Sequence, residues 1–103
     1  MTLENLFKER LLADCVECEK LGLSAHIGRR MVLEHGAIEA AKRLIQSGTA
    51  QKGFISLMKK GDKGRQCTME NRIVDSKFSS LFEPKDVELA KWRLDNWEKL
   101  PIS

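Results

Sequence analysis

The chain has 103 residues, of which 42% are hydrophobic and 32% charged, and its formal net charge at pH 7 is +3. This length and composition predict one domain over residues 1–103 and exclude a disordered polypeptide. The uninterrupted apolar runs are much shorter than the roughly 20 residues that cross a bilayer, and the N-terminal segment has no apolar core of a signal peptide. We therefore expect a cytoplasmic protein.

Apolar residues at helical spacing predict a long first helix from Leu3 to Leu21. Thr2 is placed to cap its N-terminus, since a threonine hydroxyl accepts a hydrogen bond from a free backbone N–H of the first turn. Gly22 is placed to end it. The predicted buried stripe recurs every three or four residues and consists of Leu3, Phe7, Leu11, Cys15 and Cys18.

Two shorter helices are predicted next. Ser24 is the expected N-cap of a helix that continues to Glu34, and His35-Gly36 separates it from a third helix over Ala37 to Gln46. Gly28 lies inside the second helix, where close packing against another helix is one reason to tolerate a glycine. The predicted inward residues of the second helix are Ala25, Ile27, Met31 and Val32, and the outward ones are His26, Arg29 and Arg30.

Apolar residues in the second half of the chain predict short helices. Residues 53–60 form one with Phe54, Leu57 and Met58 inward, residues 61–66 a loop, and residues 69–75 another helix that Thr68 caps and that buries Met69, Ile73 and Val74. Phe78, Leu81 and Phe82 add an apolar patch. The last helix begins at Pro84, buries Val87, Ala90, Leu94 and Trp97, and stops at Pro101. With no strand signal, we predict an all-α, single-domain bundle of five or six helices with long first and last helices.

Several short motifs follow one another in a particular order: GAIEAAKRLI at 36–45, GF at 53–54 with Leu57, TMENRIV at 68–74, LF at 81–82 and a charged closing helix. Over about residues 31–97 this order resembles a family of small uncharacterised all-helical bacterial proteins. The resemblance implies a helical module without an assigned activity, and its association with nucleases of mobile or restriction-like elements favours a nucleic-acid setting. The chain departs from the pattern at 59–67, where KKGDKGRQC is longer and more basic.

Cys15 and Cys18 form a CxxC motif with three interpretations. Both lie on the apolar stripe of a predicted helix, which favours packing, because a buried free cysteine behaves as a small hydrophobic residue. A zinc site would need further ligands such as His26, His35 or Cys67. A redox pair normally opens a helix beside a strand, and none is predicted here.

No catalytic or cofactor motif is evident in the sequence. Gly61-Asp-Lys-Gly64 lacks the GK[ST] ending of a phosphate loop and a preceding strand, and no small-molecule substrate is indicated. His26 shares a predicted helix face with arginines, and His35 falls near a helix C-terminus, where the helix dipole favours a histidine cation. We therefore expect a protein that is not an enzyme and has no cofactor.

The positive charge of the chain is concentrated in its middle. Residues 24–66 contain nine basic and three acidic side chains. Within them, the two helices predicted at 24–34 and 37–46 are joined at His35-Gly36, and together they have the length and the small-residue turn of a helix-turn-helix. If the basic residues gather on one surface, they would contact nucleic acid or an acidic protein partner. If they do not, they are solvent-exposed side chains on the outward faces of the helices. The candidate contact residues are Arg29, Arg30, Lys42, Arg43, Lys59, Lys60, Lys63 and Arg65.

Trp92 lies off the predicted apolar stripe of the last helix, so it is either covered by another segment or exposed as an interface anchor. Taken together, the sequence predicts a non-enzymatic helical interaction module of a bacterial system, acting through a protein partner or a homodimer. The alternatives are a nucleic-acid-binding module and a metal-binding domain that uses Cys15 and Cys18.

Overall fold

Local signals at the helix ends start several of the observed helices. In the computed structural model, which describes residues 1–102, the Thr2 hydroxyl accepts a hydrogen bond from the Asn5 N–H at 3.1 Å, and Thr68 does the same for Asn71. Pro84 occupies the first turn of the last long helix. These three predicted starts are confirmed, because each depends only on residues within one turn.

The predicted all-helical fold is confirmed. Within residues 1–102 there are seven α-helices, two 3₁₀ turns and one isolated β-bridge between Ala50 and Ile102. The α-helices are α1 (Leu3–Lys20), α2 (His26–His35), α3 (Ala37–Gln46), α4 (Lys52–Lys59), α5 (Asp62–Arg65), α6 (Met69–Val74) and α7 (Pro84–Asp95), with 3₁₀ turns at Ser79–Leu81 and Trp97–Lys99.

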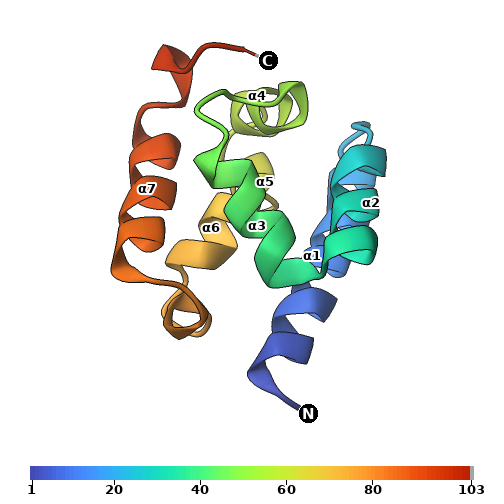
Figure 1. Cartoon of the computed structure of the whole chain (residues 1–103). Coiled ribbons are helices and arrows are strands. Elements are labelled where there is room, and N and C mark those ends of the chain that lie inside the picture. The colour runs from blue at the N-terminus through green and yellow to red at the C-terminus, as the bar shows by residue number, and fades with distance from the viewer. Residues whose placement is uncertain (103) are drawn as a thin grey trace.

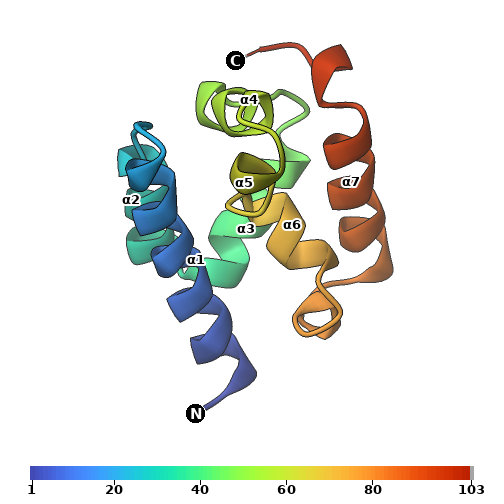
Figure 2. The same ribbon diagram turned by 180° about the vertical axis from the view of Figure 1, so that it is seen from behind.

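The helices surround α3, which runs through the middle of the molecule (Figure 1). α1 and α2 form an antiparallel pair on one side, and α6 and α7 pack together on the other (Figures 1 and 2). α3 contacts α1, α2, α6 and α7. α4 lies at one end, packed against α5 and the last 3₁₀ turn.

The main core lies where α1, α3 and the segment before α7 meet. Phe7 of α1 is fully buried and contacts the rings of Phe78 and Phe82 edge-on, with centroid distances of 5.3 and 5.4 Å. Ala40 and Ala41 let α3 approach its neighbours closely, because both are fully buried and carry only a methyl group. The apolar patch predicted at 77–82 is thus part of this core.

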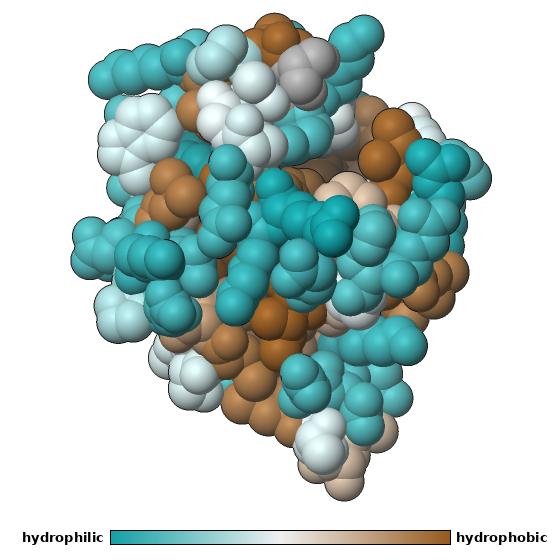
Figure 3. Space-filling model, in the orientation of Figure 1, coloured by the Kyte–Doolittle hydropathy of each residue, from teal (hydrophilic) through white to brown (hydrophobic). Residues whose placement is uncertain are grey.

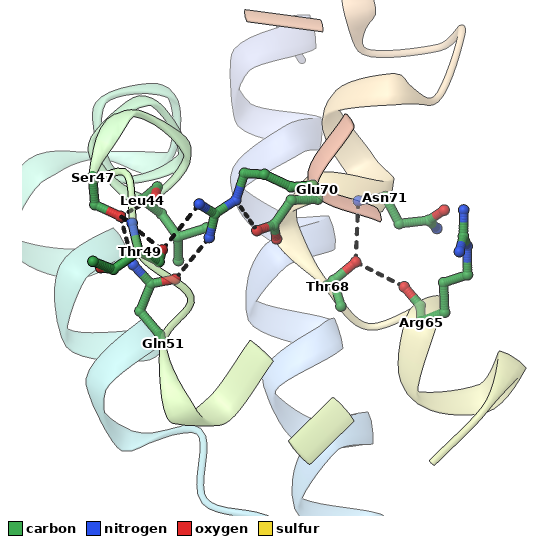
Figure 4. Close-up of polar contacts among 9 residues, drawn as sticks. Leu44, Ser47, Thr49, Gln51, Arg65, Thr68, Glu70 and Asn71 are labelled. Atoms are coloured by element: carbon green, nitrogen blue, oxygen red, sulfur yellow. Dashed lines mark hydrogen bonds and ion pairs between the residues drawn. The ribbon is translucent and has the colours of Figure 1, made fainter. Parts of the chain in front are cut away.

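A buried ion pair joins α6 to α7. Glu70 and Arg93 are each 1% exposed, and the Arg93 Nε donates to a Glu70 carboxylate oxygen at 2.9 Å. The same guanidinium donates to the Thr49 carbonyl at 3.0 Å and to the Gln51 side-chain oxygen at 3.1 Å (Figure 4). One buried cation therefore ties α6, α7 and the α3–α4 connection together, and the sequence did not reveal it.

Several predicted details are wrong. Ala25, not Ser24, is the N-cap of α2, and the Ser24 hydroxyl instead accepts from the His26 N–H at 3.3 Å. Ile27, predicted inward, is 66% exposed. Gly28 is not required by close packing, because an added Cβ would meet only the end of Met69 at an ordinary 3.7 Å.

Two boundaries in the second half also differ from the prediction. Residues 61–66 contain the short helix α5 instead of a loop, which raises the number of α-helices from the predicted five or six to seven in the described chain. The last helix ends at Asp95, and a 3₁₀ turn follows before Pro101. At both places the chain continues with tight helical turns that apolar periodicity cannot locate.

Candidate functional site

An apolar groove opens between α2 and α4. Its volume is about 620 Å³, and its floor comes from α1 and from the start of α6. In Figure 3 a hollow with hydrophobic atoms in its wall lies between these two helices. The apolar lining includes Leu11, Cys15, Ile27, Met31, Phe54 and Met69. The groove exists because α4 packs on α5 and the last 3₁₀ turn, whereas α2 packs on α1 and α3.

All three cysteines line this groove. Cys15 and Cys18 are buried together with Ala25 and Leu57, and the Cys67 thiol donates to the Lys63 carbonyl at 3.3 Å. Burial raises the pKa of each of the three thiols above its ordinary value of 9.0. The three thiols are therefore protonated at neutral pH, and those of Cys15 and Cys18 act as apolar wall groups, as the packing interpretation of this pair predicts.

The zinc interpretation finds no geometric support. In the part of the chain that the structure describes, no group of three or more His, Cys, Asp and Glu side chains is placed to hold a metal ion. His26 is exposed on the first turn of α2. His35 lies near a helix C-terminus, as predicted, but it is the last residue of α2 itself, and its Nε2 is 4.0 Å from a Glu34 carboxylate oxygen.

One rim of the groove carries positive charge. Lys52, the first residue of α4, lines the groove and is exposed, and Lys59 follows seven residues later. Seven residues are almost two helical turns, so both residues lie on the same side of α4, although Lys59 itself does not line the groove. Neither has an ion-pair partner among residues 1–102.

The basic residues predicted as contacts divide into two groups. The four arginines pair with carboxylates of the same chain: Arg29 with Glu19, Arg30 with Glu34, Arg43 with Glu39 and Arg65 with Asp95. The Arg29 pair is bidentate, with distances of 2.7 and 3.0 Å. The four lysines make no ion pair within residues 1–102: Lys42 on α3, Lys59 and Lys60 at the end of α4, and Lys63 on α5.

Other exposed apolar residues lie outside the groove. Trp92 on α7 is 47% exposed, so the exposed alternative is the correct one for this side chain. Its role as an interface anchor stays a prediction. Leu33 on α2 is 62% exposed and does not line the groove either. Ile27 differs from both because it stands at the groove itself.

Comparison with protein-family models, curated proteins and solved structures gives no match for this chain. The family resemblance inferred from the motifs at 36–45, 53–57, 68–74 and 81–82 therefore stays a prediction. Among the described residues, no helix combines the length and apolar character needed to cross a membrane.

Proposed function

We propose that this protein is a binding module that receives the apolar face of an amphipathic helix from a protein partner in the groove between α2 and α4. The partner helix would place its apolar side chains between Ile27 and Met31 on one wall and Phe54 on the other. The flank of that helix next to α4 would be acidic. Binding by an apolar helix in a groove between two helices is a common mode of peptide recognition.

The position of Ile27 is the observation that carries this proposal. Its side chain is 66% exposed at the rim, so the apolar surface extends beyond the hollow itself. A small ligand enclosed in the hollow would leave Ile27 in water, whereas a helix spanning the opening would cover it. Exposed apolar surface continuous with a groove is typical of a protein interaction site.

Charge selects the chemistry of the partner. Lys52 and Lys59 share one side of α4 and have no carboxylate partners in the described chain, so they favour acidic side chains on the bound helix. The arginines that would supply a nucleic-acid surface are already paired with carboxylates. This difference supports an acidic protein partner over the nucleic-acid alternative.

Two model peptides test the proposal. Both are helical and carry the same leucines at positions i, i+4 and i+7; one has glutamates along one flank, and the other has lysines there. We expect fluorescence anisotropy to show tighter binding of the glutamate peptide, and the double change Lys52→Glu with Lys59→Glu to reverse the preference. Each charged contact at an exposed rim is worth about 0.2–1 kcal/mol, so the reversal should change the affinity ratio by roughly ten-fold.

The matched control is Lys91→Glu with Lys99→Glu, which changes net charge equally at residues that lie outside α4 and do not line the groove. This control should leave the preference for the glutamate peptide in place. Equal binding of both peptides, or the same reversal in the control, would show that total charge and not the α4 rim governs binding.

A further inference from the structure

A second cleft adjoins the groove, and its lining is polar. It lies between α1 and the α5–α6 segment, has a volume of about 520 Å³ and shares Asp14 and Cys67 with the apolar groove. Four basic side chains line it, Arg10, Lys20, Lys63 and Arg72, with two acidic ones, Asp14 and Glu17. We propose that this cleft binds the phosphate group of a small phosphorylated molecule through Arg10, Arg72 and Lys63.

A buried carboxylate orients the two arginines. Asp14 is 3% exposed and accepts from Arg72 Nε at 2.7 Å and from a second Arg72 nitrogen at 2.9 Å, while an Arg10 terminal nitrogen lies 3.1 Å away. Guanidinium groups held in this way keep further N–H groups for another acceptor. Their fixed, forked geometry suits the oxygens of a phosphate.

Arg10 has an unused donor. Its Nε is buried and has no hydrogen-bond partner, the one such side-chain atom found among the described residues. A buried donor without an acceptor costs free energy, and native structures usually supply a partner from protein, water or ligand. An oxyanion bound beside Arg10 would supply that acceptor once the Arg10 side chain, which is 39% exposed, turns its Nε toward the cleft.

The charge balance of the cleft favours an anion. Glu17 is neutralised by Lys20 at 3.2 Å, and Asp14 is shared by two arginines. Lys63, at the edge of the cleft, has no carboxylate partner among residues 1–102. Positive charge in a concave site with low-dielectric walls attracts anions more strongly than the same charge on an open surface. A cleft of this size matches the range of small-molecule sites, about 300–1,000 Å³.

Titration with inorganic phosphate at constant ionic strength, with chloride as the balancing anion, tests this inference. In ¹H–¹⁵N spectra we expect the Nε–Hε signals of Arg10 and Arg72 to shift saturably. Lys63→Ala should weaken phosphate binding by roughly ten-fold, as expected for losing one charge-assisted contact. Lys63 is exposed, so this variant should fold normally. Arg10→Met should abolish the saturable shift, with helical circular dichroism confirming its fold.

Lys60→Ala is the matched control, because Lys60 is also exposed and does not line the cleft. It should bind phosphate as tightly as the unchanged chain. Shifts that do not saturate, or an equal loss in Lys60→Ala, would overturn the assignment. A response of Arg10 and Arg72 to duplex DNA but not to phosphate or a nucleoside monophosphate would do so too, in favour of nucleic acid. None of these results depends on whether the apolar groove binds a helix.

Discussion

Arg93 is the largest side chain that the fold buries completely, and its partner Glu70 is equally buried. Burial raises the pKa of Glu70, and the neighbouring Arg93 guanidinium opposes that rise. Neither residue belongs to the apolar positions predicted for its helix. Their burial follows from the meeting of α6, α7 and the α3–α4 connection, which local periodicity does not describe.

Removing one member of this pair leaves the other charge buried. We expect Arg93→Met to lower the free energy of unfolding by about 3–5 kcal/mol. The double variant Glu70→Leu with Arg93→Met should recover a large part of that loss, because no uncompensated charge remains. Urea denaturation followed by circular dichroism measures both. A double variant as unstable as the sum of the losses from Arg93→Met and from Glu70→Leu alone would contradict this description of the pair.

The Glu19–Arg29 pair joins α1 to α2 beside the groove and titrates with pH. The hydrogen bond that the Glu19 carboxylate accepts from Arg29 lowers the pKa of Glu19 below the ordinary value of 4.5. A carboxyl group whose pKa is lower in the folded state than in the unfolded state stabilises the fold at pH values above its unfolded-state pKa. This contribution disappears as the pH falls through its folded-state pKa. The difference in stability between the unchanged protein and Glu19→Gln should therefore shrink as the pH falls below 4.5.

Thermal denaturation of both proteins across this pH range measures that difference. Arg29→Ala should lose the same pH-dependent part, since it removes the group that lowers the pKa. An advantage over Glu19→Gln that stays constant below pH 4.5 would mean that the pair does not form in solution.

At the scale of elements, the sequence predicted the starts of those helices that depend on residues within one turn. It did not predict the contacts between helices. Thr2, Thr68 and Pro84 begin helices as expected, and α3 has the predicted bounds. The prediction that Ile27 faces inward was wrong because α2 packs on α1 and α3 with Val32 as its buried residue, which leaves Ile27 at the open groove. The helix α5 was missed because Gly64 within it and Gly61 before it favour a loop unless the tertiary structure holds them.

Gly64 shows what holds α5. A Cβ at this position would overlap the backbone carbonyl of Leu57 in α4, so only glycine lets the two helices approach this closely. Gly64→Ala should destabilise the protein by about 1–3 kcal/mol, as overpacked sites do. Gly53→Ala is the matched control: it lies within α4 with no atom within 4 Å of an added Cβ. This change should stabilise the protein by about 0.5–1 kcal/mol.

Thermal melts of the two glycine variants give opposite shifts if the packing of α5 on α4 is as described. Similar shifts in the two variants would indicate that Gly64 acts through general helix propensity, not through its contact with Leu57.

At the scale of the whole molecule, two clefts meet at Asp14 and Cys67, one apolar and one polar. The candidate site could be predicted only in part. The basic character of the central segment was visible in the sequence, and Lys59 and Lys63 were among the candidate contacts. The groove itself was not predictable, because it depends on the separation of α2 from α4, and Lys52 gained significance only from its place on that rim.

The location of a bound helix tests the central proposal most directly. In a complex with the glutamate-flanked peptide, we predict nuclear Overhauser effects from the peptide leucine methyls to the methyl groups of Ile27, Met31 and Met69 in the groove. Contacts confined instead to Leu33 on the far side of α2, or to Trp92 on α7, would place the interaction elsewhere and contradict the assignment of the α2–α4 groove.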